Sequence, residues 1–265
     1  MATTDLSGGP TDLSGGPRIL ALWSAPRSRS TAFLRMMDER GDRAVLHEPF
    51  SQLADFGVSR VGAVGGAGVV EVRSESALIT AIRSAADARP VFFKDTTDFR
   101  YPGLLADEAF LRDAAHTFLI RSPGEVIASH YALNRDLRRD DVGIARLSEI
   151  HDAVAAAGGR PPVVVDSDDL VADPEATVRA YCAAVGIRFI AEALSWRAKT
   201  LPEWGTTLRW HEKTARTTGF AAPPPRPGAL DEIAASPLLT GYLEFHRPYY
   251  EKLRRNRVRV GPGLP

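Results

Sequence analysis

The stretch "LWSAPRSRSTAFLRMM" (residues 22–37) decides the fold, because it joins an apolar strand to a helix through a short polar turn. The preceding run "RILALW" (residues 18–23) predicts a short buried strand. After the turn, Phe33, Met36 and Met37 recur at helical spacing. A strand, a tight turn and a helix in this order form the first unit of an α/β sheet.

The turn itself has the composition of an anion site. The first N–H groups of a helix lack intrahelical partners, and together with the helix dipole they attract negative charge. Ser30 and Thr31 add hydroxyl donors, and Arg27 adds a guanidinium. The stretch lacks the glycines and the Lys of the nucleotide loop G-x-x-x-x-G-K-[ST]. Taken alone, it fits an anion site and a Ser-capped helix with a surface Arg equally well.

Apolar strands and helical patterns alternate along the next part of the chain. Continuous apolar strands of this kind are typical of a parallel sheet that is covered on both faces. We therefore predict a single α/β domain with a central parallel sheet and helices on both faces, with ligands at the carboxyl ends of the strands. Further strands are predicted at 44–50, 90–95, 115–120 and 161–166. Helices are predicted at 31–40, 121–133, 141–159, 173–187 and 238–255, and the stretch 69–89 is expected to lead into another helix.

Bulk composition excludes some classes of partner. Among 265 residues, Lys plus Arg and Asp plus Glu both total 33, so net charge gives no reason to expect a nucleic-acid or membrane partner. The single cysteine, Cys182, excludes an intramolecular disulfide and suits a reducing compartment. No apolar run reaches the length of about 20 residues that spans a bilayer, and no secretory signal is recognised. We expect a cytoplasmic protein.

Two segments differ from the α/β pattern. Residues 4–17, "TDLSGGPTDLSGGP", repeat seven residues twice and are rich in Gly, Ser and Pro, so residues 1–17 are predicted to be a disordered tail before a domain at 18–265. Within that domain, residues 196–228 contain Trp196, Trp204, Trp210 and a Pro-rich run. This composition predicts an irregular lid or acceptor-binding segment.

A second anion candidate lies in "IRSPGEVIASHY" (residues 120–131). Arg121 closes a predicted strand, and Ser129 follows eight residues later on the next helix. Eight residues are about two helical turns, so one anion against this helix can touch both side chains. The alternative is a capped helix with Ser129 in its packing interface. Two strand-end anion sites in one chain indicate a ligand with two phosphates.

A Mg-nucleotide enzyme is one rival interpretation. The run "PPVVVDSDD" (residues 161–169) ends on acidic residues, and Asp166 mimics the strand-end carboxylate of a P-loop kinase or ATPase. Such an enzyme also needs the loop Lys, which is missing here.

Both anion candidates resemble motifs of one family. "SAPRSRST" resembles the 5′-phosphosulfate loop of sulfotransferases that use 3′-phosphoadenosine 5′-phosphosulfate (PAPS), in the branch whose loop begins Pro-Arg-Ser. "RSPGEVIAS" resembles their 3′-phosphate motif, and "SDDLVADPEATVRAYCAAVGI" resembles a following strand–helix segment. The resemblance covers roughly residues 18–190 and implies a P-loop-like sulfotransferase fold.

The resemblance also implies roles for individual residues. Arg27 would stabilise charge on the leaving 5′-phosphate, and Lys94 would contact the sulfuryl oxygens. Arg121 and Ser129 would hold the 3′-phosphate, and adenosine 3′,5′-bisphosphate (PAP) would leave. The 5′-phosphate would be cradled by Arg27, Ser28, Arg29, Ser30 and Thr31, and Lys213 and Arg216 would replace a C-terminal basic segment of the family.

The resemblance implies Glu48 as the general base. In many relatives the base is a His two positions after the Lys, but this chain has Lys94-Asp95-Thr96 and lacks that His. In the Pro-Arg-Ser branch the base is a Glu that follows the loop. Glu48, which lies 22 positions after Pro26, matches that Glu. A carboxylate beside the sulfuryl group accepts the acceptor's proton, preferably with a pKa raised by burial. Alternatively, Glu48 pairs with Arg27 or Arg29, and Asp95 or Asp98 is the base.

Some expectations concern neighbouring positions. On an extended strand His47 should point away from Glu48. No metal site is predicted, and His116, His130, His151, His211 and His246 are given no ligand role.

The chain departs from the family at Arg29 and Ser167, and it has no clear match to the family's C-terminal basic-Gly segment. Arg29 replaces the usual Gly of the loop, which speaks against positive φ there, and Ser167 replaces an adenine-contacting Tyr.

The expected activity is sulfuryl transfer from PAPS to a hydroxyl of a small-molecule acceptor. The "FGVSRVGAVGGAGVV" segment (residues 56–70) and the Trp-rich segment are expected to form the acceptor walls. Besides the kinase or ATPase, the remaining alternative is a catalytically silent nucleotide-binding homologue.

Overall fold

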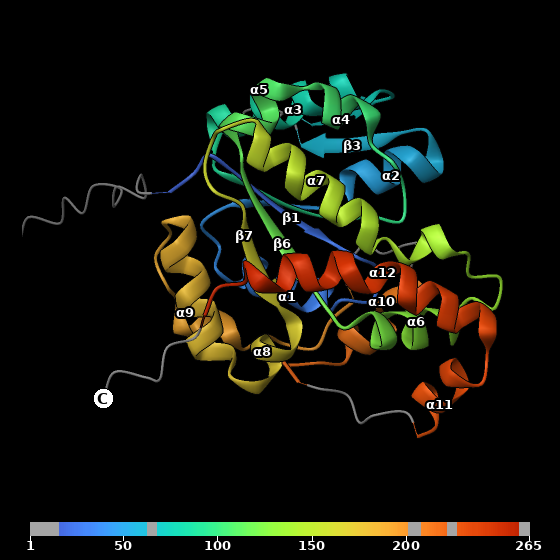
Figure 1. Cartoon of the computed structure of the whole chain (residues 1–265). Coiled ribbons are helices and arrows are strands. Elements are labelled where there is room, and N and C mark those ends of the chain that lie inside the picture. The colour runs from blue at the N-terminus through green and yellow to red at the C-terminus, as the bar shows by residue number, and fades with distance from the viewer. Residues whose placement is uncertain (1–15, 63–67, 201–207, 222–226, 260–265) are drawn as a thin grey trace, which may run out of the picture.

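A five-stranded parallel sheet forms the centre of the protein (Figure 1), in a computed structural model that describes residues 16–62, 68–200, 208–221 and 227–259. Its strand order is β2-β5-β1-β6-β7. The strands are β1 (Ile19–Ser24), β2 (Ala44–His47), β5 (Val91–Thr96), β6 (Ala115–Ile120) and β7 (Val163–Asp166). The parallel sheet confirms the fold class that the apolar runs predict.

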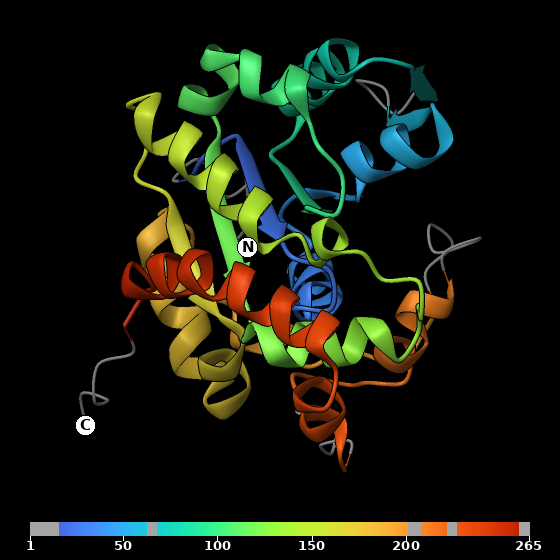
Figure 2. The same cartoon turned by 45° about the vertical axis from the view of Figure 1, so that its right-hand side comes forward.

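Helices cover both faces of the sheet, which explains the continuous apolar strands. Successive side chains of a strand point to opposite faces, so Ala21 and Trp23 pack on one side and Leu20 and Leu22 on the other. The first side is covered by α3, α7 and part of α12, and the second by α1 and α9. Figure 2 shows α12 lying between α7 and α6, outside the sheet.

The helices follow the strands in chain order. They are α1 (Ser30–Glu39), α2 (Pro49–Phe56), α3 (Glu75–Ala88), α4 (Pro102–Ala106), α5 (Glu108–Asp113), α6 (Pro123–Tyr131), α7 (Ile144–Ala156), α8 (Ser167–Ala172), α9 (Pro174–Val185), α10 (Leu208–Ala215), α11 (Ala229–Ala234) and α12 (Pro237–Arg255). In the described part of the chain, no helix is both long enough and apolar enough to cross a membrane.

The sequence prediction was wrong about the region after the second strand. The predicted strand 44–50 ends early, at His47, because Glu48 has a left-handed backbone (φ 51°) and Pro49 begins α2. An antiparallel hairpin, β3 (Ser59–Gly62) with β4 (Val69–Val72), lies in the Gly- and Val-rich segment around residues 56–70, where no strand was predicted.

Two predicted segments fall partly or wholly outside the described residues. Residues 1–15 of the predicted tail lie outside them. Within 196–228, residues 201–207, with Trp204, and residues 222–226 also lie outside. The described part of this segment includes α10, so it is not irregular throughout.

Candidate active site

One cavity of about 2730 Å³ opens at the carboxyl ends of the parallel strands. The segments that follow β1, β2, β5 and β6 all reach its wall, as expected for a parallel sheet. The wall includes most of the residues that the sequence analysis selected: Arg27, Arg29, Ser30, Thr31, Glu48, Lys94, Arg121, Ser129 and Arg216.

The turn between β1 and α1 presents a row of backbone donors. Arg27 and Arg29 have left-handed backbones, with φ of 66° and 68°. Within the described residues, the N–H groups of residues 27–31 have no hydrogen-bond partner. Successive N–H groups in a turn of this kind form a concave nest that binds anions. The expectation that an Arg at position 29 speaks against positive φ was wrong.

Arg27 lies at the centre of a group of polar contacts. Its Nε donates to Ser129 Oγ at 3.3 Å, and its guanidinium also donates to the Trp210 carbonyl at 2.7 Å. Arg121 donates to the Arg27 carbonyl at 2.9 Å. Burial, and then the nearby Arg121 charge, lower the pKa of Arg27 to about 10. Two partly buried cations so close together favour an anion between or beside them.

Arg121 and Ser129 are joined through Arg27 and not to each other. Arg121 also pairs with Glu125, Nε to Oε2 at 3.2 Å, on the first turn of α6. Both predicted 3′-phosphate residues face the cavity. A phosphate bound beside Arg121 and Ser129 would replace their present contacts with Arg27 and Glu125 by charge-assisted hydrogen bonds to its own oxygens.

Other residues of the loop are engaged elsewhere. The Arg29 guanidinium donates to the Ser167 carbonyl at 3.1 Å, to Ser167 Oγ at 3.0 Å and to Asp168 Oδ1 at 2.7 Å. The Ser28 side chain is fully buried and is not on the described cavity wall. The Lys213 side chain lies outside the described part of the chain. Of the predicted loop side chains, Arg27, Ser30 and Thr31 therefore remain to face a ligand.

Glu48 and Lys94 form a buried ion pair on the cavity wall. The pairs of Glu48 with Arg27 or Arg29 that the sequence left open are not formed; the partner is Lys94. Burial alone would raise the pKa of Glu48, but the Lys94 charge and hydrogen bond, together with His47 and His211, lower it to about 2. The expectation of a raised pKa was therefore wrong for this ion-paired state.

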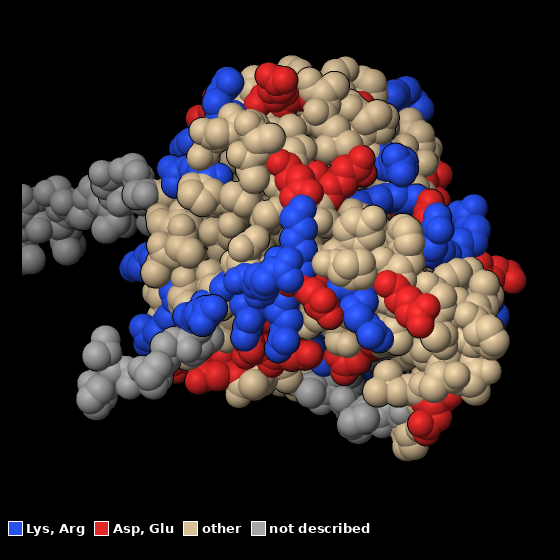
Figure 3. Space-filling view, in the orientation of Figure 1, with Lys and Arg blue, Asp and Glu red and all other residues tan. Residues whose placement is uncertain are grey.

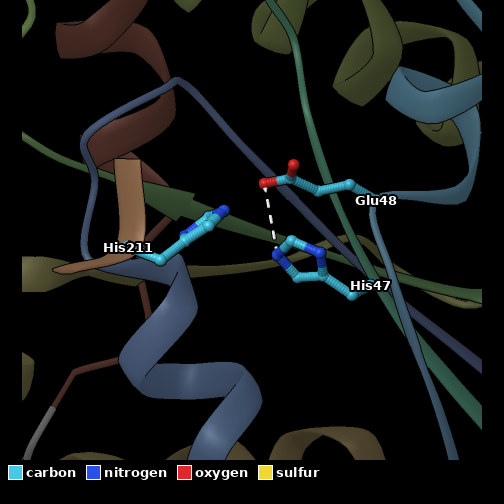
Figure 4. A group of neighbouring side chains, drawn as sticks. All are labelled: His47, Glu48 and His211. Atoms are coloured by element: carbon cyan, nitrogen blue, oxygen red, sulfur yellow. Dashed lines mark ion pairs between the residues drawn. The ribbon is translucent and has the colours of Figure 1, made fainter. Parts of the chain in front are cut away.

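His47 and His211 lie beside Glu48 (Figure 4). His47 Nε2 is 3.7 Å from Glu48 Oε1, and the His47 and His211 rings meet edge to face with centroids 4.9 Å apart. The predicted outward direction of His47 was wrong, because the backbone turns at Glu48 and is no longer extended. Burial lowers the pKa of His47 to about 4 and that of His211 to about 3, so both are neutral near pH 7.

His211 is a site residue that the sequence did not predict, whereas Trp210 belongs to the segment at 196–228 that was expected to contact the acceptor and lies on the cavity wall. His211 Nδ1 lies 3.2 Å from Thr31 Oγ1, and the Trp210 carbonyl binds Arg27. Both residues lie on α10, far along the chain, and no local motif marks them. The tryptophans were the available signal, but the Trp196 ring packs on Phe220 in the core and is not itself on the described cavity wall.

The two alternative bases have different surroundings. Asp95 is fully buried away from the described cavity wall and accepts hydrogen bonds from the N–H groups of Phe50 (2.6 Å) and Ser51 (3.0 Å). Burial raises its pKa to about 7 in spite of these donors. Asp98 is on the cavity wall, and burial raises its pKa to about 6.

Asp166 has a structural role that does not suit a Mg-nucleotide enzyme. Its carboxylate caps α8 by accepting from the Asp168 N–H at 3.0 Å. It also accepts from the Tyr250 hydroxyl at 3.2 Å and pairs with Arg254 at 3.4 Å, both on α12. It is absent from the cavity wall as far as the described residues define it.

The surface over α12 carries both signs of charge. Figure 3 shows basic and acidic side chains side by side on this face. One such pair joins Lys252 on α12 to Asp152 on α7 at 2.5 Å. The basic groups that matter for an anion are those inside the cavity.

Comparison with known proteins identifies the class that this fold and cavity define. Residues 17–254 match the family described as "Sulfotransferase domain", which is most of the chain. The chain belongs to the sulfotransferase family, and the resemblance found in the sequence is confirmed.

Two curated relatives come from Arabidopsis thaliana. "Branched-chain-amino-acid aminotransferase-like protein 2" is 30% identical over 208 residues, which are 77% of this chain and 36% of that protein. "Branched-chain-amino-acid aminotransferase-like protein 1" is 29% identical over 241 residues, which are 89% of this chain and 41% of that protein. The chain spans well under half the length of these relatives, so the activity in their names is not transferred to it.

A solved structure supports the fold. The "Sulfotransferase Domain from the Curacin Biosynthetic Pathway" superposes with a TM-score of 0.51 at 13% identity. The match covers 89% of this chain and 99% of that domain. At this identity the likeness shows a shared P-loop-like α/β fold, in agreement with the prediction.

Proposed function

We propose that this sulfotransferase moves a sulfuryl group from PAPS to a hydroxyl of a small-molecule acceptor. The observation that carries the proposal is the turn at residues 27–31, whose backbone N–H groups have no partner among the described residues. Arg27, Arg29, Ser30 and Thr31 of this turn line the cavity, and Arg121 lies on the same wall. This arrangement fits an anionic donor with two phosphates.

Each group of residues has a task in donor binding. The turn at residues 27–31, with the Thr31 hydroxyl, would hold the 5′-phosphate, and Arg121 with Ser129 would hold the 3′-phosphate. The donor supplies a sulfuryl group whose bond to the 5′-phosphate oxygen breaks as the acceptor oxygen bonds to sulfur. Arg27 stabilises the charge that returns to that phosphate, and Lys94 stabilises the sulfuryl oxygens.

Glu48 is the proposed proton acceptor, and Lys94 controls its basicity. In the ion pair the pKa of Glu48 is about 2, too low for an efficient base near neutral pH. When Lys94 shares its charge with the sulfuryl oxygens, the carboxylate loses part of the attraction that lowers its pKa. Glu48 thus becomes a stronger base only when the donor is in place, and the acceptor's hydroxyl proton passes to it.

The charges on the wall suit a transfer without a divalent metal. A sulfuryl group carries less negative charge than a transferring phosphoryl group. Arg27, Lys94 and Arg121 together supply the positive charge that Mg²⁺ supplies in nucleotide enzymes. The intact Lys94–Glu48 pair also speaks against a catalytically silent homologue.

The outer wall of the cavity favours an acceptor with an apolar portion. Phe56, Leu133 and Leu230 line it and expose 51%, 45% and 60% of their surfaces. Exposed apolar side chains around a polar site commonly mark a ligand surface. Phe56 and Val58 come from the segment at 56–70 that was expected to contact the acceptor.

Calorimetry with PAP and AMP tests the donor. PAP should bind at least about tenfold more tightly than AMP, because one set of charge-assisted hydrogen bonds to the 3′-phosphate contributes about 1.5–3 kcal/mol. Arg121→Ala should abolish this preference. Arg112→Ala, which removes an exposed arginine paired with Asp113 away from the cavity, should leave it intact. Equal affinities of the wild type for PAP and AMP would refute the two-phosphate donor.

A further inference from the structure

His47, Glu48 and His211 bring three metal-ligating side chains together. One ligand atom from each lies within 4.8 Å of the other two, and the three side chains point toward one another in Figure 4. We propose that these residues form a binding site for a transition-metal ion such as Zn²⁺, and that the ion competes with Lys94 for Glu48. An ion bound at this site would stop sulfuryl transfer.

The donor set matches the chemistry of such ions. Two imidazole nitrogens and one carboxylate oxygen are a common ligand set for Zn²⁺ and other divalent transition metals. The His47 side chain is only 4% exposed, and its Nε2 has no hydrogen bond to any described residue while it faces Glu48 at 3.7 Å. A buried nitrogen that is aimed at a carboxylate without a hydrogen bond between them leaves room for an ion to join the two.

The surrounding structure orients the ligands. His47 closes β2, Glu48 is fixed in the turn before α2, and His211 comes from α10. Thr31 Oγ1 lies 3.2 Å from His211 Nδ1, and hydrogen bonds to the second ring nitrogen commonly orient metal-binding histidines. Closing the cluster around an ion needs side-chain shifts of about 1 Å, since ligand bonds to Zn²⁺ are about 2.0–2.2 Å long.

The main cost of binding comes from the neighbouring cations. Lys94 already pairs with Glu48, and Arg27 lies on the same wall. An ion must therefore take the carboxylate from Lys94, which makes the affinity depend on that lysine. It also gives the proposal a signature: removing the Lys94 charge should strengthen metal binding, whereas removing any ligand should weaken it.

A Zn²⁺ titration of the full chain, without donor or acceptor, tests the site. We expect one saturable Zn²⁺ per chain, and at least about tenfold weaker binding by His47→Ala and by His211→Ala. Lys94→Met should bind Zn²⁺ more tightly than the wild type. His130→Ala, which removes a histidine of the same cavity outside the trio, should bind like the wild type.

Controls separate ligand loss from misfolding. Tighter binding by Lys94→Met cannot arise from a damaged fold, and Co²⁺ absorption bands lost in both histidine variants would report the ligands directly. Any of three results would overturn the proposal. The wild type could show no saturable binding below millimolar Zn²⁺, both histidine variants could bind Zn²⁺ as tightly as the wild type, or Lys94→Met could bind Zn²⁺ more weakly than the wild type. Because no sulfuryl donor is present, these results are independent of whether the chain uses PAPS.

Discussion

The backbone N–H of Glu48 donates to the Lys94 carbonyl at 2.7 Å, and the side chains of the same two residues form an ion pair. The two residues are thus joined twice, because β2 and β5 are neighbours and His47 is in register with Lys94. The proposed base and the proposed sulfuryl-binding lysine therefore keep a fixed separation. A ligand can redirect the Lys94 charge without moving either strand.

Replacing the proposed base should reduce turnover. Glu48→Gln keeps size and hydrogen bonding but cannot accept the proton, so turnover of PAPS with a hydroxyl acceptor should fall about 10²–10⁴-fold. PAP affinity by calorimetry should change little. Asp55→Asn, an exposed acid on the same wall, is the matched control and should retain activity. Retained turnover in Glu48→Gln would move the base to Asp98, since Asp95 is held away from the wall.

The same substitution should change the acid dependence of stability. The pKa of Glu48 falls from 4.5 to about 2 on folding, so its stabilisation is complete above about pH 4.5 and is lost as pH falls toward 2. Glu48→Gln should be less stable than wild type by about 3 kcal/mol near pH 7. Urea unfolding should show this difference shrinking between pH 4.5 and 2. Glu71→Gln, in an exposed pair with Arg60, should show almost no difference at any pH.

A glycine at position 29 should be more stable than an alanine there. Both Arg29→Gly and Arg29→Ala remove the ion pair with Asp168, so their comparison isolates the backbone. Because φ is 68° at this position, Arg29→Gly should exceed Arg29→Ala in unfolding free energy by about 1 kcal/mol. Denaturant unfolding measures both. Equal stabilities would mean that the turn relaxes out of the left-handed region.

Chelation should leave sulfuryl transfer intact. EDTA should not reduce turnover of PAPS, because Arg27, Lys94 and Arg121 provide the positive charge of the site. Release of PAP in EDTA, compared with release in added Mg²⁺, measures this. Activity that disappears in EDTA and returns with Mg²⁺ would instead favour the kinase or ATPase interpretation.

Strands that are buried on both faces could be predicted from sequence. The runs at 90–95, 115–120 and 161–166 match β5, β6 and β7 within two residues, because each contains consecutive apolar residues and is bounded by polar residues or turns. The hairpin of β3 and β4 was not predicted. Val69 and Val70 are exposed and the strands are short, so neither length nor alternation distinguishes them from a loop.

The site could be predicted only where its motif is local. Arg27 and Thr31 follow β1, Lys94 lies near the end of β5, and all three line the same cavity. The inward direction of His47 depends on one left-handed residue, Glu48, which no propensity predicts for a glutamate. The approach of His211 to Thr31 depends on the path of the C-terminal segment, which sequence spacing does not encode.

The position of β1 has a consequence for how the protein is made. Within the described residues β1 is the first strand along the chain and the middle strand of the sheet, and its two partners, β5 and β6, come much later in the sequence. During synthesis, the emerging β1 therefore has two unpaired edges until both partners have left the ribosome. Unpaired apolar edges invite association with other chains. The nascent chain should therefore depend on chaperones most strongly before residue 120 emerges, and a stop within β6 should give an aggregating product.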